Sequence, residues 1–118
     1  MAAYVISDVE PRDRDLIERY RALAEASIKK YGGRYIVRGG EIESVEGGWN
    51  PCHLVIVECP DMDRAREWYR SEDYAEALMV RELALSRRLI FVEGTARGRQ
   101  DDTGATASGP VLRPADLR

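Results

Sequence analysis

The sequence predicts an α+β domain in which four strands form one antiparallel sheet and helices cover one of its faces. Two observations along the chain predict this fold. The spacing of apolar residues changes from every second residue to every third or fourth and back again, twice. Gly-Gly pairs and prolines stand at several of these changes. The element order is therefore βαββαβ, and a chain of 118 residues suits a single domain with one core.

The first part of the pattern is a strand followed by an amphipathic helix. Residues 3–10 are rich in Tyr, Val and Ile, which is typical of a strand. Residues 11–31 carry apolar side chains at three- and four-residue steps, with Asp13 as the expected N-cap. Gly32 and Gly33 supply the left-handed turn that ends many helices, so we expect the first helix to end there.

The next part predicts a hairpin. In its first strand, residues 34–46, side chains are expected to alternate between the two faces of the sheet. One face carries Arg34, Ile36 and Arg38, and the other carries Tyr35 and Val37. The glycine pair at 39–40 predicts a bulge or bend, after which the strand resumes with Ile42 and Val45. "GGWNP", residues 47–51, predicts the hairpin corner. The nearly all-apolar residues 52–59 predict a central strand.

The last part predicts two helical segments and a final strand. Asp61 is expected to cap the first segment, and Ser71 the second, which runs through residues 74–87. Residues 88–94 form the expected last strand. The completed order is that of the ferredoxin-like fold, with its four-stranded antiparallel sheet.

One face of this sheet has no helices to cover it. The chain offers more apolar side chains than two helices need, so we expect a second copy to pack sheet to sheet and form a dimeric α+β barrel. The residues expected on that face are Ile36, Leu54, Ile56, Val57 and Phe91. We expect the domain to span residues 1–94, and residues 95–118, which are poor in apolar side chains, to form a flexible tail.

The composition argues against several classes of function. A formal net charge of −3 and the absence of a basic cluster argue against nucleic-acid binding. No apolar run approaches the ~20 residues that span a bilayer, and no secretory signal starts the chain, so we expect a cytoplasmic protein without a membrane partner. Cys52 and Cys59, at the two ends of one expected strand, are too far apart for a disulfide, and we expect two buried thiols. With a single histidine and no CxxC, we expect no metal and no cofactor.

Four segments together resemble a known family: "KYGGRYIVRGGEIESVEG", "VIVECP", "EWYRSEDY" and "LIFVEG". Over residues 3–94 the chain resembles domain of unknown function 1330, a family of the dimeric α+β barrel superfamily. The resemblance implies a ferredoxin-like protomer whose sheet packs against that of a partner. The superfamily includes cofactor-independent oxygenases, muconolactone-type isomerases and haem-binding or haem-degrading enzymes. The resemblance therefore implies no single reaction.

The predicted catalytic residues are Arg38 and His53. A guanidinium beside the glycine bend suits a carboxylate, enolate or phenolate ligand; the alternative is a surface arginine paired with Glu41 or Glu43. His53 is the only histidine, and an ordinary imidazole, with a pKa of about 6.5, exchanges protons near neutral pH. The alternative for His53 is an exposed or hydrogen-bonded strand residue without a catalytic role.

The residues predicted to contact a ligand are Tyr35, Glu41, Trp49 and Arg81. Tyr35 and Trp49 are expected to shape a pocket, and the alternative for Trp49 is packing in a subunit interface. Arg81 lies near the inward stripe of a helix, where its charge needs a partner. That partner is either Glu58 or Glu93, or an acidic ligand.

Two functions remain open on the sequence. The first is a homodimer that binds a small anionic or aromatic molecule and catalyses proton transfer or oxygenase-type chemistry without a cofactor. In it, Arg38 stabilises negative charge and His53 acts as acid or base. The second is a non-enzymatic binding or accessory module whose barrel is filled by side chains. A pocket that contains both Arg38 and His53 would count against the second function.

Overall fold

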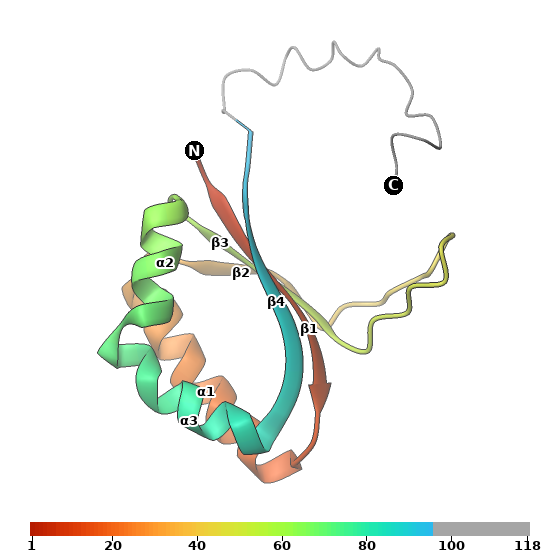
Figure 1. Ribbon diagram of the computed structural model, residues 1–118, viewed down its shortest axis with the longest axis horizontal. Coiled ribbons are helices and arrows are strands. Elements are labelled where there is room, and N and C mark those ends of the chain that lie inside the picture. Colours follow the sequence, from red (N-terminus) through yellow and green to blue (C-terminus); the bar gives the residue numbers. More distant parts are fainter. Residues whose placement is uncertain (96–118) are drawn as a thin grey trace.

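Three helices lie on one face of a four-stranded sheet (Figure 1). The structure is a computed structural model, and it describes residues 1–95. The strands are β1 (Ala3–Pro11), β2 (Arg34–Arg38), β3 (Leu54–Cys59) and β4 (Leu85–Glu93), and the helices are α1 (Arg14–Lys30), α2 (Met62–Arg70) and α3 (Glu72–Ala84). The strand order is β2-β3-β1-β4 with every pair antiparallel, which confirms the predicted α+β fold. The predicted tail, residues 95–118, lies outside the described residues except for Thr95.

Side-chain caps begin the helices where the sequence predicts them. Asp13 Oδ1 accepts a hydrogen bond from the backbone N–H of Leu16 at 3.0 Å, and Asp61 caps α2 in the same way at 2.8 Å. Ser71 Oγ accepts from the N–H of Tyr74 at 3.1 Å and so separates α2 from α3. Each cap satisfies an N–H that the helix leaves unpaired, which is worth about 1 kcal/mol. Within residues 1–95, no helix has the length and apolar character needed to cross a membrane.

The last strand begins earlier than predicted. Helix α3 ends at Ala84, whereas the apolar spacing predicted a helical segment up to residue 87. Leu85 pairs with Pro11 at the end of β1, and the N–H of Arg12 donates to the carbonyl of Ala84 at 2.8 Å. Contacts with the distant N-terminal strand therefore end the helix, and local spacing does not reveal them.

The segment between β2 and β3, residues 39–53, is a projecting arm. It contains no strand, so the predicted continuation through Ile42 and Val45 is wrong, and Val45 is 84% exposed. The predicted corner is present, because Gly47 and Gly48 adopt φ of 87° and 71°, which glycine allows at little cost. In Figure 1 the arm, in yellow, extends away from the helices.

A β-bulge in β2 overturns the predicted faces of this strand. The register shifts between Tyr35 and Val37, so that Tyr35 pairs with Val57 while Arg38 pairs with Val55. These two valines are two residues apart in β3 and share one face. Tyr35 and Arg38 therefore lie on the same face of the sheet, where strict alternation placed them on opposite faces.

The helix-covered face of the sheet forms the core. Val57 and Phe91 both pair with Val5, which is 4% exposed beneath the helices. The prediction that Val57 and Phe91 lie on the uncovered face is therefore wrong. Cys59 is buried in this core, but Cys52 is exposed in the arm, so only one of the two thiols is buried as expected.

On the other face, here called the open face, no helix of residues 1–95 covers the sheet, and apolar side chains lie there. Direct strand pairing places one row of them across all four strands: Val37, Ile56, Ile6 and Ile90. Ile90 is 57% exposed in the protomer. Leu54 and Ile56 lie on this face, as predicted.

Candidate functional site

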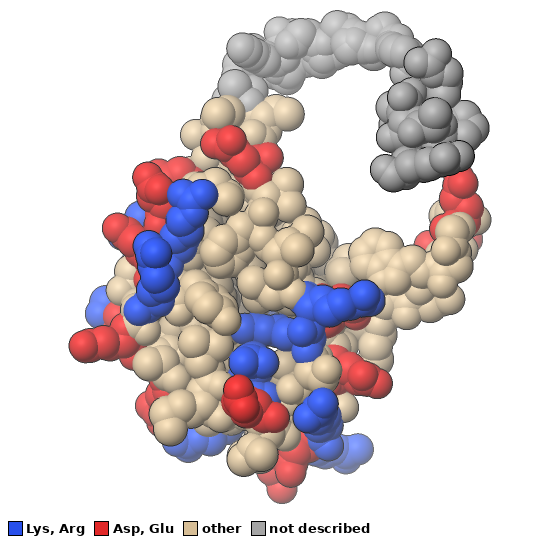
Figure 2. All heavy atoms as spheres, viewed as in Figure 1, with Lys and Arg blue, Asp and Glu red and all other residues tan. Residues whose placement is uncertain are grey.

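A cavity of about 60 Å³ lies between α1 and the helix-covered face of the sheet. Aliphatic side chains of α1, β1, β3 and β4 make up about half of its lining residues. Its titratable side chains are basic or phenolic: Arg21, Arg38, Arg87, His53, Tyr20 and Tyr35. No acidic residue of the described part of the chain lines it. Figure 2 shows basic side chains gathered over the middle of β4, beside the helices. A cavity lined by basic side chains and no acidic ones favours the binding of an anion.

The bulge in β2 brings Tyr35 and Arg38 together at the wall of the cavity. The guanidinium of Arg38 lies 4.0 Å from the centre of the Tyr35 ring. Its ion-pair partner is Glu25 on α1, at 3.4 Å, and not Glu41 or Glu43. Burial raises the pKa of the Tyr35 hydroxyl to about 12, despite the opposing effect of Arg38, so this phenol is neutral at physiological pH.

His53 stands at the base of the arm, directly before β3. Its carbonyl accepts a hydrogen bond from the N–H of Val9 at 2.9 Å, which fixes its backbone against β1. Its ring lies against Gly39, where an added Cβ would be 2.4 Å from Cε1 of the imidazole. Gly39 also has a φ of 73°. Gly39 therefore makes room for the imidazole and also adopts a left-handed backbone conformation.

Replacing Gly39 with alanine is expected to displace the His53 ring. The new Cβ would overlap the imidazole, whereas at Gly48, which has nearly the same φ, it would meet no atom within 4 Å. We expect Gly39→Ala to lower the free energy of unfolding by about 2–4 kcal/mol and Gly48→Ala by about 1–2 kcal/mol, because both substitutions force a left-handed alanine but only the first overpacks. Urea denaturation measures both values.

The single histidine makes a direct readout of that displacement possible. Its imidazole signals in a ¹H–¹³C correlation spectrum belong to one residue, His53. They should shift in Gly39→Ala and stay in place in Gly48→Ala. Equal stability losses with unmoved imidazole signals in both variants would contradict the proposed contact.

The structure places the other predicted ligand contacts away from the cavity. Glu41 lies in the exposed arm. Trp49 lines a shallow hollow on the open face, with Asp8 and Arg88. Arg81 pairs with neither of its expected partners but with Glu82, at 3.6 Å, while its Nε is buried without a hydrogen-bond partner in the described residues. Of the six predicted site residues, the cavity brings together Tyr35, Arg38 and His53.

A further polar group in the cavity was not predicted. Arg87 of β4 donates from Nη1 to the Tyr20 hydroxyl at 2.6 Å and from Nη2 to the Tyr74 hydroxyl at 2.8 Å. The two hydroxyls also contact each other at 2.5 Å. Burial opposes the charge of Arg87, but the two phenol oxygens raise its pKa above the usual value, so the guanidinium stays protonated. Burial raises the pKa of Tyr74 far above 10, so its phenol stays neutral.

The position of Arg87 explains why the sequence did not reveal this group. The apolar spacing predicts that Arg87 ends a helix, and only in a strand that starts at Leu85 does Arg87 fall on the inward face, with Leu85, Leu89 and Phe91. An arginine in such an inward apolar series is the signal that could have revealed it. No group of three or more metal-ligating side chains occurs within residues 1–95.

Fold and cavity together define the class of this protein: a ferredoxin-like α+β domain with a small basic cavity between its helices and its sheet. The chain belongs to the family described as Domain of unknown function (DUF1330), whose model matches residues 2–95. This confirms the family predicted from the sequence. No curated protein matches the chain.

Solved structures of low sequence identity share the fold. A protein of unknown function from Rhodopseudomonas palustris, RPA0582, is 19% identical, with 80% of this chain and 83% of that chain covered and a TM-score of 0.66. SnoaB, a cofactor-independent oxygenase from Streptomyces nogalater, is 9% identical, with coverage of 82% and 96% and a TM-score of 0.58. A dimeric protein of unknown function and ferredoxin-like fold from Bacteroides fragilis is 12% identical, with coverage of 79% and 96% and a TM-score of 0.54. At these identities the likeness shows the fold alone.

Proposed function

We propose that the protein is a homodimer, that each protomer binds a small anionic or aromatic molecule in its cavity, and that it catalyses proton transfer on that molecule without a cofactor. The observation that carries the proposal is the lining of the cavity. It combines Arg38, Arg87 and His53 with no acidic side chain of residues 1–95. The alternative, a barrel filled by side chains, leaves no room for a ligand, and a cavity lined by both Arg38 and His53 counts against it.

The positions of Arg38 and His53 suit the removal of a proton next to a carbonyl group. This step leaves an enolate, whose negative charge an arginine stabilises. The ion pair of Arg38 with Glu25 is long, and the Glu25 side chain is 53% exposed, so a ligand can displace it at little cost. The imidazole of His53 accepts or returns the proton. An enolate is also electron-rich enough to react with dioxygen, so the same first step serves oxygenase-type chemistry.

The open face supports the homodimer. A row of apolar residues crosses all four strands there, and a contiguous apolar patch of this kind is typical of an interface. Trp49, 56% exposed, reaches the same face from the arm. A protein of this fold from Bacteroides fragilis is described as dimeric, which agrees with the proposal. Dimerisation through the open face leaves the cavity on the helix side of the sheet available to a ligand.

Deuterium exchange at the methyl group of pyruvate tests the catalytic proposal. A base that removes a methyl proton in D₂O returns a deuteron, and ¹H NMR follows the loss of the methyl signal. We expect the protein to accelerate this exchange, and His53→Gln and Arg38→Met each to lower the acceleration by about 10²–10⁴-fold. Arg34→Met is the matched control, because Arg34 also lies in β2 but pairs with Glu58 and does not line the cavity.

Binding provides a second measurement on the same variants. We expect pyruvate, acetoacetate or benzoate to raise the melting temperature of the protein, and to do so less in Arg38→Met and His53→Gln. Circular dichroism establishes that each variant is folded. Full ligand-induced stabilisation in both folded variants would overturn the assignment of Arg38 and His53.

A further inference from the structure

We infer that Arg87 is the anchor for a carboxylate group and that the ligand of this cavity is a small aliphatic carboxylate. The inference rests on the proposed function, because it concerns the same cavity, and it names both the residue that recognises the ligand and the chemical class of that ligand. Three observations carry it: the charge balance of the cavity, the geometry around Arg87 and the volume of the cavity.

The charge balance singles out Arg87 among the three arginines of the cavity wall. Arg21 pairs with Glu18 at 3.0 Å, and Arg38 pairs with Glu25 at 3.4 Å. Arg87 forms no ion pair with any carboxylate of the part of the chain that the structure describes.

The phenols around Arg87 do not supply the missing negative charge. Burial raises the pKa of Tyr74 far above its usual value, so its hydroxyl is a neutral partner at physiological pH. The two hydroxyls stabilise the charged guanidinium, but neither is a carboxylate, so an anion in the cavity gains a charge-assisted hydrogen bond to Arg87. Arg87 therefore contributes one positive charge to the cavity without a carboxylate partner, and this favours a ligand with one negative charge.

The geometry around Arg87 presents the guanidinium in a fixed orientation. Tyr20 of α1 and Tyr74 of α3 each accept one of its N–H groups. A guanidinium has five N–H donors, so donors remain for a ligand. A planar carboxylate accepts two parallel N–H groups of this fork, and phosphate can do the same, so the choice between them rests on the single negative charge of a carboxylate. Tyr20 also lines the cavity, so its hydroxyl can hydrogen-bond to the same ligand.

The volume of the cavity limits the size of the ligand. About 60 Å³ is several times the roughly 10–15 Å³ that a cavity needs to hold one water molecule. An apolar cavity that accommodates benzene measures about 150 Å³ on the same kind of scale. The cavity therefore fits a short aliphatic carboxylic acid better than one with an aromatic ring.

Isothermal titration calorimetry with four probes tests the anchor and the ligand class together. The probes are pyruvate, its uncharged amide pyruvamide, benzoate and inorganic phosphate. We expect pyruvate to bind at least tenfold more tightly than each of the other three. Arg87→Met should weaken pyruvate binding by about 10–100-fold, because a charge-assisted pair of hydrogen bonds is lost. Arg87→Lys should restore only part of the affinity, since lysine keeps the charge but not the planar fork.

Arg88→Met is the matched control for Arg87→Met. Arg88 is the next residue of β4, points to the open face and pairs with Asp8 at 3.3 Å. The Arg88→Met variant should therefore bind pyruvate as tightly as the unmodified protein. If Arg87→Met does not fold, Tyr20→Phe replaces it, because this variant keeps the charge but removes one hydroxyl partner; a loss of pyruvate affinity of about threefold or more is then expected.

The outcomes separate this inference from the proposed function. If Arg38→Met and His53→Gln weaken pyruvate binding but Arg87→Met does not, Arg87 is not the anchor and the proposed function stands. Tighter binding of benzoate than of pyruvate would overturn the assignment of an aliphatic ligand. Tighter binding of phosphate than of pyruvate would overturn the assignment of a carboxylate ligand. Failure of every carboxylate to bind the unmodified protein would overturn both the inference and the proposed function.

Discussion

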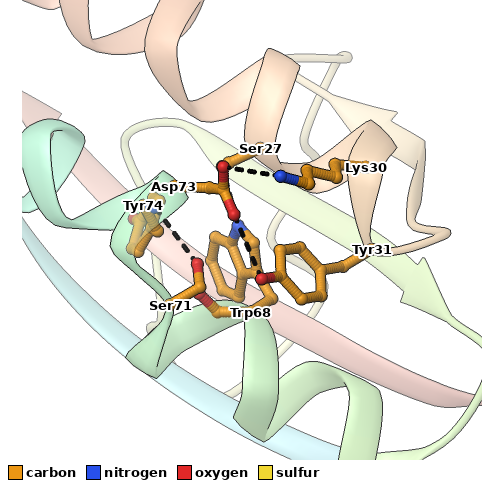
Figure 3. A network of polar contacts seen from close by, with 7 residues as sticks. All are labelled: Ser27, Lys30, Tyr31, Trp68, Ser71, Asp73 and Tyr74. Atoms are coloured by element: carbon orange, nitrogen blue, oxygen red, sulfur yellow. Dashed lines mark hydrogen bonds and ion pairs between the residues drawn. The ribbon is translucent and has the colours of Figure 1, made fainter.

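Replacing Trp68 with alanine is expected to lower the free energy of unfolding by about 3–5 kcal/mol, the range for a large aromatic side chain removed from a core. Trp68 is 3% exposed, and its ring centre lies 4.2 Å from that of Tyr74. Its indole N–H donates to Ser27 Oγ on α1 at 2.9 Å. Figure 3 shows this indole between α1 and the start of α3. The substitution therefore removes packing and an interhelical hydrogen bond at once.

Trp68→Phe separates these two contributions. Phenylalanine keeps a ring in the core but loses the N–H, and the Ser27 hydroxyl still donates to the carbonyl of Ala24 at 2.9 Å. We expect a loss of about 1–2 kcal/mol for this variant. Guanidinium denaturation followed by circular dichroism measures both variants, because Trp49, the remaining tryptophan, is exposed and reports poorly on the core. Similar losses in the two variants would mean that the hydrogen bond, and not packing, dominates.

Features that depend on neighbours in the sequence could be predicted. The cap residues Asp13, Asp61 and Ser71 were identified correctly because a cap acts over three residues of one chain segment. The order of elements followed from the apolar period for the same reason. The start of β4 at Leu85 could not be predicted from the apolar period, because pairing with the distant Pro11 determines where this strand begins.

The candidate site also combines features that neighbouring residues predict with features that depend on contacts between distant parts of the chain. Tyr35 and Arg38 come from β2 and His53 from the end of the arm that follows it, so all three lie within one short stretch of the chain. The bulge that turns Arg38 toward Tyr35 depends on pairing with β3, so strict alternation gave the wrong face. Tyr20 of α1 lies 54 residues before Tyr74 and 67 before Arg87, and only the folded sheet and helices bring the three together.

Ile90→Asp is expected to convert the proposed dimer into a monomer. Ile90 lies at the β4 end of the apolar row and is 57% exposed in the protomer, so the monomer should tolerate a polar residue there. In a sheet-to-sheet dimer the symmetry places the substitution in the interface twice. A carboxylate buried without a partner costs about 2–5 kcal/mol, so the pair of substitutions should weaken association by several orders of magnitude.

Sedimentation velocity at micromolar concentration measures this change. Met79→Asp is the matched control, because Met79 is 75% exposed but lies on α3, in the layer opposite the open face. The unmodified protein and Met79→Asp should sediment as dimers, and Ile90→Asp as a folded monomer. A monomeric unmodified protein, or a dimer that Met79→Asp disrupts and Ile90→Asp leaves intact, would contradict dimerisation through the open face.

The same variant connects the dimer to the cavity. The cavity lies between the helices and the sheet, so each protomer contains its whole lining. A folded Ile90→Asp monomer should therefore still bind pyruvate with close to the original affinity. A monomer that binds pyruvate tenfold more weakly would mean that the partner protomer supports the arm, and with it His53 and Arg38 at the base of the arm.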